Sequence, residues 1–351
     1  MKAVVFHEHG PVENLSLESV PVPEPGAGDV RIKVAYCALN HLDLWTRDGL
    51  PGLKLEMPHI GGSDISGTVD TLGAGTERYG FQPGDRVVVN PGVSCGHCRF
   101  CRMGEDPLCD TYHILGEHTR GGYAEYAVVP VRSLMSVPEG VPLKTAAAAS
   151  LAYQTAYRMV VGRAKLRPRE NLLVLGAGSG VSTACIQIGK MLGATVYTIT
   201  SSDEKMRLAK AIGADHVVDY TKDTEWEKTL YKLSGKRGMD VVVDHVGEAT
   251  WVKSMRTLGK GGRIVTCGGT TGPKLQLDVR HLFWKGHTVM GSTMANDQEW
   301  REVMGLVYAG KLEPVIDTEF GFADLPDAHR RMEEAEQFGK IVIRVAGEPD
   351  S

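Results

Sequence analysis

The sequence has no uninterrupted apolar run approaching the roughly 20 residues that are needed to cross a lipid bilayer. Its first residues carry charges where a secretory signal requires an apolar stretch, so we expect no cleaved leader. The chain also has no large excess of positive or negative charge. The 39 basic and 43 acidic residues are interspersed and give a net charge of −4, which argues against a nucleic-acid-binding surface.

Cysteine is scarce, with seven residues in the chain of 351. Cys37, Cys185 and Cys267 stand alone in the sequence, which argues against a disulfide framework and favours a reducing compartment. We therefore expect a cytoplasmic protein that acts on a small molecule and binds neither membrane nor nucleic acid.

The other four cysteines lie in one short segment with the spacing C-x2-C-x2-C-x7-C: Cys95, Cys98, Cys101 and Cys109. Four thiolates from one segment can complete the tetrahedral coordination of a zinc ion and leave no open position for a substrate. The alternative is a set of disulfide-linked or incidental cysteines. Because paired C-x2-C spacings in a chain without secretory features are typical of metal ligands, we predict one structural Zn²⁺ here.

Two regions of the chain differ in composition and in expected secondary structure. The first 150 residues are rich in Gly, Pro and Val and predict a β-rich domain, with short strand-like runs between turn signals at 30–35, 67–69, 86–90 and 123–129. A helix-favouring stretch then begins near residue 145. After it, apolar strands alternate with helical segments, which predicts an α/β fold with a doubly wound parallel sheet. The expected strands are 172–175, 195–200, 216–219, 240–244, 263–267 and 288–291, with a further strand at 340–345 near the end of the chain.

A glycine-rich turn follows the first of these strands and precedes an amphipathic helix. Glycines at this position permit a tight turn and let backbone amides approach a pyrophosphate at the helix N-terminus. The turn departs from the G-x-G-x-x-G pattern, because a valine takes the place of the third glycine, and a ligand-free turn is the alternative. The strand before it and the helix after it favour a dinucleotide site. We predict that its cofactor-binding residues are Gly176, Gly178, Ser179, Gly180 and Val181.

Hydroxyl groups follow the second strand, where an NAD enzyme would usually place an acid for the ribose 2′-hydroxyl. Ser201 and Ser202 stand there, and Lys205 and Arg207 could attract a 2′-phosphate. Asp203 is the contrary observation, and both cations could equally belong to a solvated helix face. We expect NADPH as the cofactor, with NADH less favoured and with Ser201 and Lys205 in its site.

Together these features resemble the medium-chain dehydrogenase/reductase superfamily along essentially the whole chain. The resemblance implies a GroES-like β-rich catalytic domain interrupted by a Rossmann domain, with NAD(P)(H) bound in the cleft between them. The implied boundaries are 1–153, with the zinc lobe at about 92–112, then 154–292 for the Rossmann domain and 293–351 for the segment that completes the first domain. It also implies a homodimer or homotetramer, paired through the last Rossmann strand near 289–292.

The zinc-dependent alcohol dehydrogenases of that superfamily bind catalytic zinc through the Cys of a C-H-x-D segment, the His of a G-H-E-x-x-G segment and a later Cys. The corresponding positions here are Asn40, Ser63 and Leu151. Asn and Leu do not coordinate zinc usefully and Ser does so rarely. We therefore predict that the usual catalytic zinc is absent.

The N-x-x-D segment at 40–43 resembles the quinone oxidoreductase (zeta-crystallin-like) branch of the superfamily. That resemblance implies that Asn40 hydrogen-bonds the nicotinamide end of NADPH and that Thr155 lines the nicotinamide pocket. It also implies that Lys340 reaches the cofactor and that Tyr220 lies near the adenosine phosphate. Many reductases of the branch lack the four-cysteine segment, so this chain combines features of both groups.

These features predict an NADPH-dependent oxidoreductase that transfers a hydride to a quinone or to a conjugated carbonyl or enoyl substrate. Asn40, Asp43 and Tyr153 are the candidates nearest the chemistry. Tyr153 could donate a proton or merely form the pocket wall, and Asp43 could be structural rather than catalytic.

Two alternatives remain open at this point. The first is a zinc-dependent alcohol dehydrogenase with a rearranged ligand set, for which the candidates are His41, Asp43, His59 and Asp64. The second is a non-catalytic NADPH-binding protein, because glycine-rich phosphate contacts would persist in it. A further polar group follows the cysteine segment, and we expect it to form a loop that could face the active cleft: His113, Glu117 and His118.

Overall fold

The computed structural model describes residues 1–348, and the chain divides into two compact units. Unit 1 comprises Met1–Ala152 together with the chain from Ala295 onward, and unit 2 comprises Tyr153–Met294. The expected domain boundaries, after 153 and after 292, lie within two residues of these. Across residues 1–348, no helix combines the length and the apolar character required to cross a membrane.

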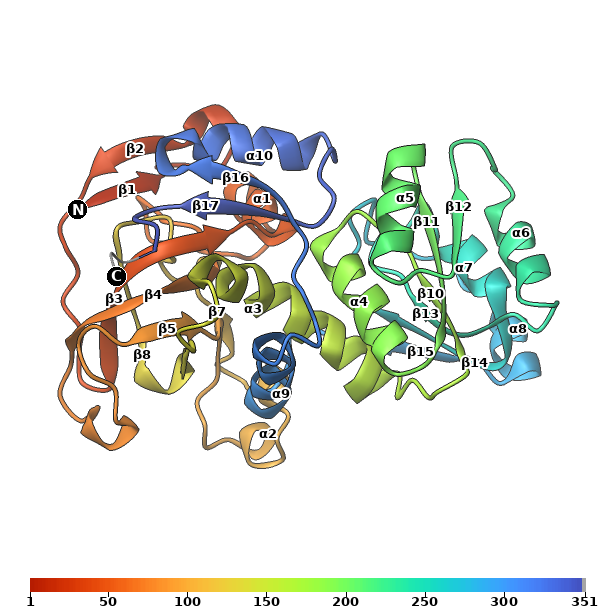
Figure 1. Cartoon of the computed structure of the whole chain (residues 1–351), viewed down its shortest axis with the longest axis horizontal. Coiled ribbons are helices and arrows are strands. Elements are labelled where there is room, and N and C mark those ends of the chain that lie inside the picture. The colour runs from red at the N-terminus through yellow and green to blue at the C-terminus, as the bar shows by residue number, and fades with distance from the viewer. Residues whose placement is uncertain (349–351) are drawn as a thin grey trace. The chain divides into compact units, whose positions relative to one another are not determined.

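Unit 1 is built on a seven-stranded sheet with the order β16-β17-β3-β4-β5-β9, in which β8 also pairs with β3 (Figure 1). Two small sheets, β1-β2 and β6-β7, accompany it. The strands are β1 (Lys2–Val5), β2 (Ser16–Ser19), β3 (Asp29–Ala38), β4 (Asp64–Leu72), β5 (Arg86–Val89), β6 (Gly92–Val93), β7 (His113–Ile114), β8 (Tyr126–Pro130), β9 (Leu134–Ser136), β16 (Ile316–Gly321) and β17 (Lys340–Arg344).

The helices of unit 1 are short, apart from α3 and α9, and α3 runs across the boundary between the units. They are α1 (His41–Asp48), α2 (Arg99–Arg102), α3 (Leu143–Tyr157), α9 (Asp297–Tyr308) and α10 (Leu325–Glu333). Single 3-10 turns occur at Val12–Asn14, Glu77–Tyr79, Asp106–Leu108, Val131–Ser133 and Phe322–Asp324.

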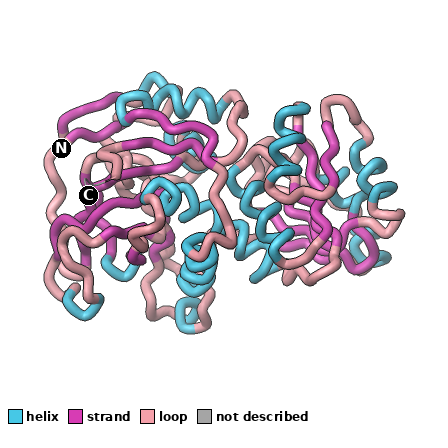
Figure 2. The backbone as a smooth tube through the Cα atoms, in the orientation of Figure 1, coloured by secondary structure: helices cyan, strands magenta, loops and turns pink. Residues whose placement is uncertain are grey.

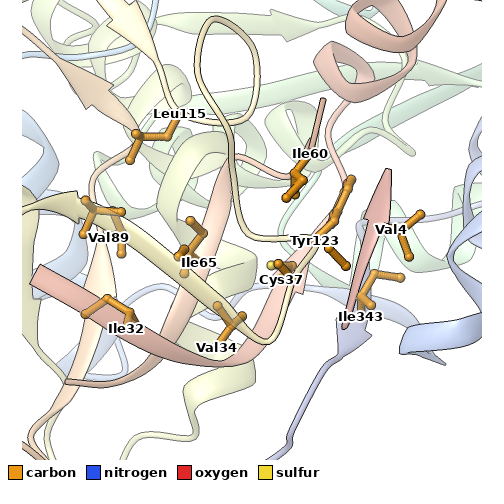
Figure 3. Packing of buried hydrophobic residues seen from close by; sticks show 14 of the residues in the cluster. Val4, Ile32, Val34, Cys37, Ile60, Ile65, Val89, Leu115, Tyr123 and Ile343 are labelled. Carbon is orange, nitrogen blue, oxygen red and sulfur yellow. The ribbon is translucent and has the colours of Figure 1, made fainter. Parts of the chain in front are cut away.

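The core of unit 1 lies where buried apolar side chains of its long strands meet. Val34 and Cys37 of β3, Ile65 of β4 and Ile343 of β17 are all fully buried in one cluster with Tyr123, as Figure 3 shows. Val34 and Cys37 are three residues apart, and the register shift of β3 between Val34 and Tyr36 explains how both can belong to this one cluster.

Unit 2 is a six-stranded parallel sheet with the order β12-β11-β10-β13-β14-β15, which is the strand order of a Rossmann domain (Figure 2). Its strands are β10 (Asn171–Val174), β11 (Thr195–Thr200), β12 (His216–Asp219), β13 (Met239–Val243), β14 (Leu258–Thr266) and β15 (Thr288–Gly291). Its helices are α4 (Gly180–Met191), α5 (Asp203–Ala211), α6 (Trp226–Leu233), α7 (Trp251–Thr257) and α8 (Val279–Lys285), preceded by a π-helical turn at Arg158–Arg163. In Figure 1, α4 and α5 cover one face of this sheet and α6 and α7 the other.

The predicted fold class is confirmed, and the differences from the expected strands are local. The strand expected from Tyr123 begins instead at Tyr126. The residues before Tyr126 bond to β1, since Val4 N–H donates to the Tyr123 carbonyl at 2.8 Å and Glu125 N–H to the Lys2 carbonyl at 3.0 Å. Strand β14 begins at Leu258, ahead of the expected residue 263, because Leu258 already pairs with Met239 before a register irregularity.

Candidate functional site

Three charged or polar side chains form a closed, buried network in unit 1. Lys340 Nζ lies 2.6 Å from Asn40 Oδ1 and 2.9 Å from Asp64 Oδ2, and Asn40 Nδ2 donates to the same Asp64 oxygen at 2.9 Å. The side chains of Lys340 and Asp64 are 3% and 0% exposed. A buried charge of this kind is stable only when it is paired and hydrogen-bonded, as it is here.

Strand register brings these residues together from distant parts of the chain. In the antiparallel pairings of β3, Ala38 lies opposite both Asp64 of β4 and Val342 of β17. Asn40 follows the end of β3, and Lys340 begins β17. The start of β4, the start of β17 and the end of β3 therefore meet at one edge of the sheet.

Asp43 is a second buried acid close to this network. It lies in the first turn of α1, where its carboxylate accepts the backbone N–H of Asn40 at 2.7 Å and that of Gly62 at 3.1 Å. Burial nevertheless outweighs these hydrogen bonds and raises the pKa of Asp43 to about 7. Tyr123 lies beside it, and burial raises the pKa of that phenol well above its usual value.

The positions that correspond to the catalytic zinc ligands form no ligand set. The amide of Asn40 is engaged by Asp64 and Lys340, and Leu151 contributes its backbone N–H to Asp64 Oδ1 at 2.7 Å. Ser63 Oγ is buried and has no hydrogen-bond partner in the structure.

The rearranged zinc site is not formed either. His59 Nε2 lies 3.1 Å from the Gly116 carbonyl oxygen, and the His41 ring packs edge-on against Trp45. Within residues 1–348, the only group of three or more His, Cys, Asp or Glu ligand atoms close enough to share a metal ion is made of the four clustered cysteines. The structure therefore does not bring His41, Asp43, His59 and Asp64 together as a ligand set.

The four thiols of Cys95, Cys98, Cys101 and Cys109 fit a single metal ion. Their sulfur atoms all lie within 4.8 Å of one another, with Cys95–Cys101 at 3.9 Å and Cys98–Cys101 at 3.5 Å. A tetrahedral ion with metal–sulfur bonds near 2.3 Å would place the sulfurs about 3.8 Å apart. The Cys95 N–H donates to Cys109 Sγ at 3.2 Å and, as the main cause, lowers the pKa of Cys109 to about 6.

The glycine-rich turn of unit 2 has the geometry of an anion-binding helix start. Gly176 adopts φ +62°, a conformation that favours glycine, and lets the chain reverse from β10 into α4. Ser179 caps the helix by accepting the Ser182 N–H at 3.0 Å. Gly178, Ser179, Gly180 and Val181 are partly exposed, so their backbone groups are accessible to a ligand.

A histidine that sequence reasoning missed also contacts this turn. Ser182 Oγ donates to the Leu175 carbonyl oxygen at 2.7 Å, so its oxygen can only accept from His245 Nε2, which lies 2.8 Å away. His245 therefore carries a proton on Nε2. It follows β13, more than 60 residues after Ser182 in the chain, and no local pattern links the two.

Some of the residues that follow β11 bond to one another within α5 and its N-terminal cap. Ser202 Oγ accepts the Lys205 N–H at 3.2 Å and caps α5. Arg207 pairs with Glu204 at 2.7 Å on the exposed helix face, which is the alternative role that the sequence left open for it.

Three further predicted residues lie near these elements. Tyr220 follows β12 and is 43% exposed, so its ring is available to a ligand. Thr155 and Tyr153 lie in α3, where Thr155 is buried and Tyr153 has no exposed surface.

Comparisons with known proteins agree with this architecture. Residues 26–139 match the family described as alcohol dehydrogenase GroES-like domain, and residues 180–309 match the family described as zinc-binding dehydrogenase. The chain is 33% identical over 353 residues to an NAD-dependent alcohol dehydrogenase of Sulfolobus acidocaldarius, covering 98% of this chain and 100% of that protein.

Two other relatives differ in their named activities. An acryloyl-coenzyme A reductase of Sulfurisphaera tokodaii is 31% identical over 347 residues, covering 98% of this chain and 100% of that protein. A crystal structure of an NAD-dependent alcohol dehydrogenase superposes with a TM-score of 0.94 at 44% identity, covering 99% of this chain and 100% of the other. The chain therefore belongs to the medium-chain dehydrogenase/reductase superfamily, which includes the alcohol dehydrogenases, and is an oxidoreductase.

Proposed function

We propose that this protein is an NADPH-dependent reductase of a conjugated carbonyl compound, an enoyl thioester or a quinone, without a catalytic zinc. The observation that carries the proposal is the closed network of Asn40, Asp64 and Lys340. Asn40 stands where zinc-dependent relatives supply a cysteine ligand, and its amide is satisfied by a carboxylate and an ammonium. Without a Lewis acid, oxidation of a simple alcohol loses the element that lowers its pKa.

Reduction of a conjugated bond demands less of the protein. Bound NADPH would supply the hydride, and the protein would orient the substrate and stabilise the oxygen that becomes negative. The Lys340 ammonium has three N–H donors. Two of them donate to Asn40 and Asp64. The third can bind an oxygen of the cofactor or substrate. Asn40 and Thr155 are the residues we propose to contact the nicotinamide end.

The proposal of NADPH rests on the residues that follow β11. Asp203 is paired with Lys222 at 2.6 Å, which offsets part of the negative charge that would repel a 2′-phosphate. Ser201 and Lys205 are proposed to bind the 2′-phosphate, with Tyr220 beside the adenosine. Fluorescence titration with each cofactor tests this preference. Equal affinity for NADH would contradict it. This test comes first because two of the relatives described above are named as NAD-dependent enzymes.

We further propose that the four cysteines hold one structural Zn²⁺ that takes no part in the reaction. Four thiolates would complete its coordination, so no position remains for a substrate. Metal analysis should find one zinc per chain. Two zinc ions per chain would contradict the proposal and favour alcohol dehydrogenase chemistry.

Alcohol dehydrogenase activity is the second candidate, because two of the relatives described above carry that name. The acryloyl-coenzyme A reductase is nearly as similar, so sequence identity does not separate the two candidates. A screen should compare an enoyl thioester, an α,β-unsaturated ketone and 1,4-naphthoquinone under NADPH with a primary alcohol under NADP⁺ and NAD⁺. We expect reduction of at least one conjugated substrate. Oxidation of the alcohol alone would reverse the order of the two candidates.

We propose a homodimer or homotetramer that pairs through the last strand of unit 2. Strand β15 is an edge strand of the parallel sheet, and exposed strand edges favour pairing with another chain. Helix α8, which precedes β15, exposes Phe283 (65%) and Trp284 (83%). Sedimentation of the variant Trp284→Glu should show a smaller assembly than the unmodified protein. An unchanged assembly would place the interface elsewhere.

A further inference from the structure

His245 lies where the strand order of unit 2 reverses. Strands β10 and β13 are neighbours in the parallel sheet, with Leu173 opposite Val242 and Val174 opposite Val243 (Figure 1). From β10 the sheet extends through β11 to β12 on one side, and β13 returns to the other side of β10. Open parallel sheets bind their ligands beyond the carboxyl ends of the strands at such a point. The glycine-rich turn follows β10 there, and His245 comes two residues after the end of β13.

The imidazole of His245 joins these two segments through hydrogen bonds at the start of α4. Its Nε2 lies 2.8 Å from Ser182 Oγ and 3.3 Å from Ser179 Oγ. Ser179 Oγ donates to Ser182 Oγ at 3.0 Å, and Ser182 Oγ donates to the Leu175 carbonyl oxygen at 2.7 Å. Since Ser182 gives its only hydroxyl proton to Leu175, its oxygen accepts from both Ser179 and His245.

The two serines differ in exposure, which determines what the histidine contributes. Ser182 is 0% exposed, so bulk water cannot replace the proton that His245 donates to it. A buried polar atom that loses its partner destabilises the arrangement around it. Ser179 is partly exposed and belongs to the segment of the turn that we propose for the cofactor phosphates. The bond from His245 therefore stabilises the buried hydroxyl to which the exposed part of the turn is attached.

The backbone of His245 is held by the buried carboxylate that precedes it. Asp244 has no exposed surface and accepts the N–H groups of Val246 at 3.0 Å and of Gly247 at 3.1 Å. Its other oxygen accepts the hydroxyl of Ser254 at 2.6 Å. The loop after β13 therefore has a defined shape, and the His245 ring can keep a fixed position beside the glycine-rich turn.

A serine beside a histidine is also the arrangement of a nucleophile and its base. That role requires a bare histidine nitrogen and a hydroxyl that a substrate can reach. Here Nε2 of His245 carries the proton, and the Ser182 hydroxyl is buried and donates to the Leu175 carbonyl oxygen. The geometry therefore suits the support of a binding turn and not nucleophilic attack.

We propose that His245 is a positioning residue for the pyrophosphate of the bound dinucleotide, an inference that rests on the cofactor binding proposed above. It acts through Ser182 and Ser179, which keep the turn in the shape that leaves the N–H groups of Gly180 and Val181 accessible to phosphate oxygens. NADPH and NADH carry the same pyrophosphate. The contribution of His245 is therefore equal for both, unlike that of the residues proposed to bind the 2′-phosphate.

The test compares His245→Leu with His245→Gln by fluorescence titration of the full chain with NADPH and with NADH. Leu removes the N–H donor, and we expect it to weaken the binding of both dinucleotides about tenfold, the scale set by an unsatisfied buried hydroxyl. Gln carries an amide N–H that can reach the position of Nε2, so it should recover most of the affinity. His7→Leu is the matched control, because His7 is exposed and lies in unit 1, and it should bind like the unmodified protein.

A double-variant cycle tests whether His245 acts through Ser182. Ser182→Ala should by itself weaken the binding of both dinucleotides. The combined variant should bind no more weakly than His245→Leu alone, because removing the hydroxyl also removes the atom that was left without a partner. Additive losses would overturn the proposed route through Ser182.

NMR of the cofactor-free protein gives a readout that does not depend on the cofactor. Long-range ¹H–¹⁵N spectra should show a His245 ring with its proton on Nε2. This signal should be missing from His245→Leu and should shift in Ser182→Ala, and a bare Nε2 would overturn the proposal. If His245→Leu does not fold, His245→Asn takes its place, because the shorter amide cannot reach Ser182.

Each titration outcome has a distinct meaning. If His245→Leu keeps the affinity for a dinucleotide that the unmodified protein binds, the role of His245 is refuted and cofactor binding stands. If both dinucleotides bind the unmodified protein and only NADPH is weakened, His245 acts on the 2′-phosphate and the proposal is overturned. If the unmodified protein binds neither dinucleotide, the proposed cofactor function and the role of His245 both fail.

Discussion

Unit 1 contains two polar centres that the sequence encodes in opposite ways. The four thiols come from one segment, from Cys95 to Cys109, so their spacing alone predicts a metal site. Asn40 and Lys340 are 300 residues apart in the chain, and only the pairing of β3 with β4 and β17 brings them to Asp64. A site encoded in one segment can be recognised from spacing, whereas an assembled site depends on strand register.

The two centres also differ in what their side chains can do. The thiol cluster has four ligands of the kind that zinc prefers, and it would close the coordination sphere of one ion. The buried network has instead a carboxylate, an amide and an ammonium that satisfy each other. We infer that metal binding and chemistry are separated in this protein, and the following predictions test that separation.

The largest effect should follow removal of the metal from the cysteine cluster. Structural zinc sites contribute binding free energies of the order of 10 kcal/mol in small domains, and this free energy is coupled to folding. Treatment with a strong chelator, or the variant Cys101→Ser, should therefore abolish the bound zinc and lower the unfolding temperature sharply. At temperatures where the protein stays folded, kcat should be retained. A loss of kcat in proportion to the lost zinc would mean that the two centres are not separate.

The next largest effect should come from breaking the buried ion pair. Lys340→Met leaves Asp64 as an unpaired buried charge, which typically costs about 3–5 kcal/mol. Urea denaturation should show this loss in the free energy of unfolding, while the zinc content stays at one per chain. Lys311→Met is the matched control, because Lys311 is exposed.

A second variant separates the charge effect from simple loss of packing. Lys340→Met combined with Asp64→Asn removes both charges, and the Asn side chain keeps an oxygen for the Leu151 N–H. We expect the double variant to recover about 1–3 kcal/mol relative to Lys340→Met, as coupled pairs do. Additive losses would show that Lys340 and Asp64 contribute independently.

The fold could be predicted from the sequence largely because its signals are local. Alternating apolar strands and helices predict the parallel sheet of unit 2. Three of its strands have the expected bounds: 195–200, 216–219 and 288–291. Tyr123 is expected at the start of a strand over 123–129. It lies instead in a connection that bonds to β1, a long-range pairing that local propensity does not contain.

The candidate site could be predicted only in part, because its contacts also join residues that are far apart in the sequence. Family resemblance pointed to Asn40, Asp43 and Lys340 individually, but not to the ion pair of Lys340 with Asp64. Asp64 had been considered only as a metal ligand. His245 follows β13 and meets the glycine-rich turn through the parallel sheet, so no sequence spacing could reveal it.

A smaller effect should appear in the pH dependence of stability, and it tests whether Asp43 belongs to the assembled centre. The folded protein holds the Asp43 proton up to a pKa of about 7, while the ordinary value is 3.8. The free energy of unfolding therefore falls as the pH rises between these values, because the folded state binds more protons there. Asp43→Asn should remove a part of that fall on the order of 4 kcal/mol, because each pKa unit corresponds to about 1.4 kcal/mol. Urea denaturation at several pH values measures it, and an unchanged slope would mean that Asp43 ionises normally.

The smallest effect concerns the proposed cofactor phosphate site of unit 2, which, like the cysteine cluster, is encoded in one segment. Ser201→Asp would place a carboxylate at the end of β11, beside the proposed 2′-phosphate. Repulsion should weaken NADPH binding about tenfold and leave NADH binding unchanged or improved, as fluorescence titration would show. Ser234→Asp is a matched control, because Ser234 ends α6, far along the chain from β11. Equal weakening of both cofactors by Ser201→Asp would indicate a distorted strand end. An unaltered NADPH affinity would show that this segment does not bind the 2′-phosphate, and would leave Ser202 with the role of capping α5.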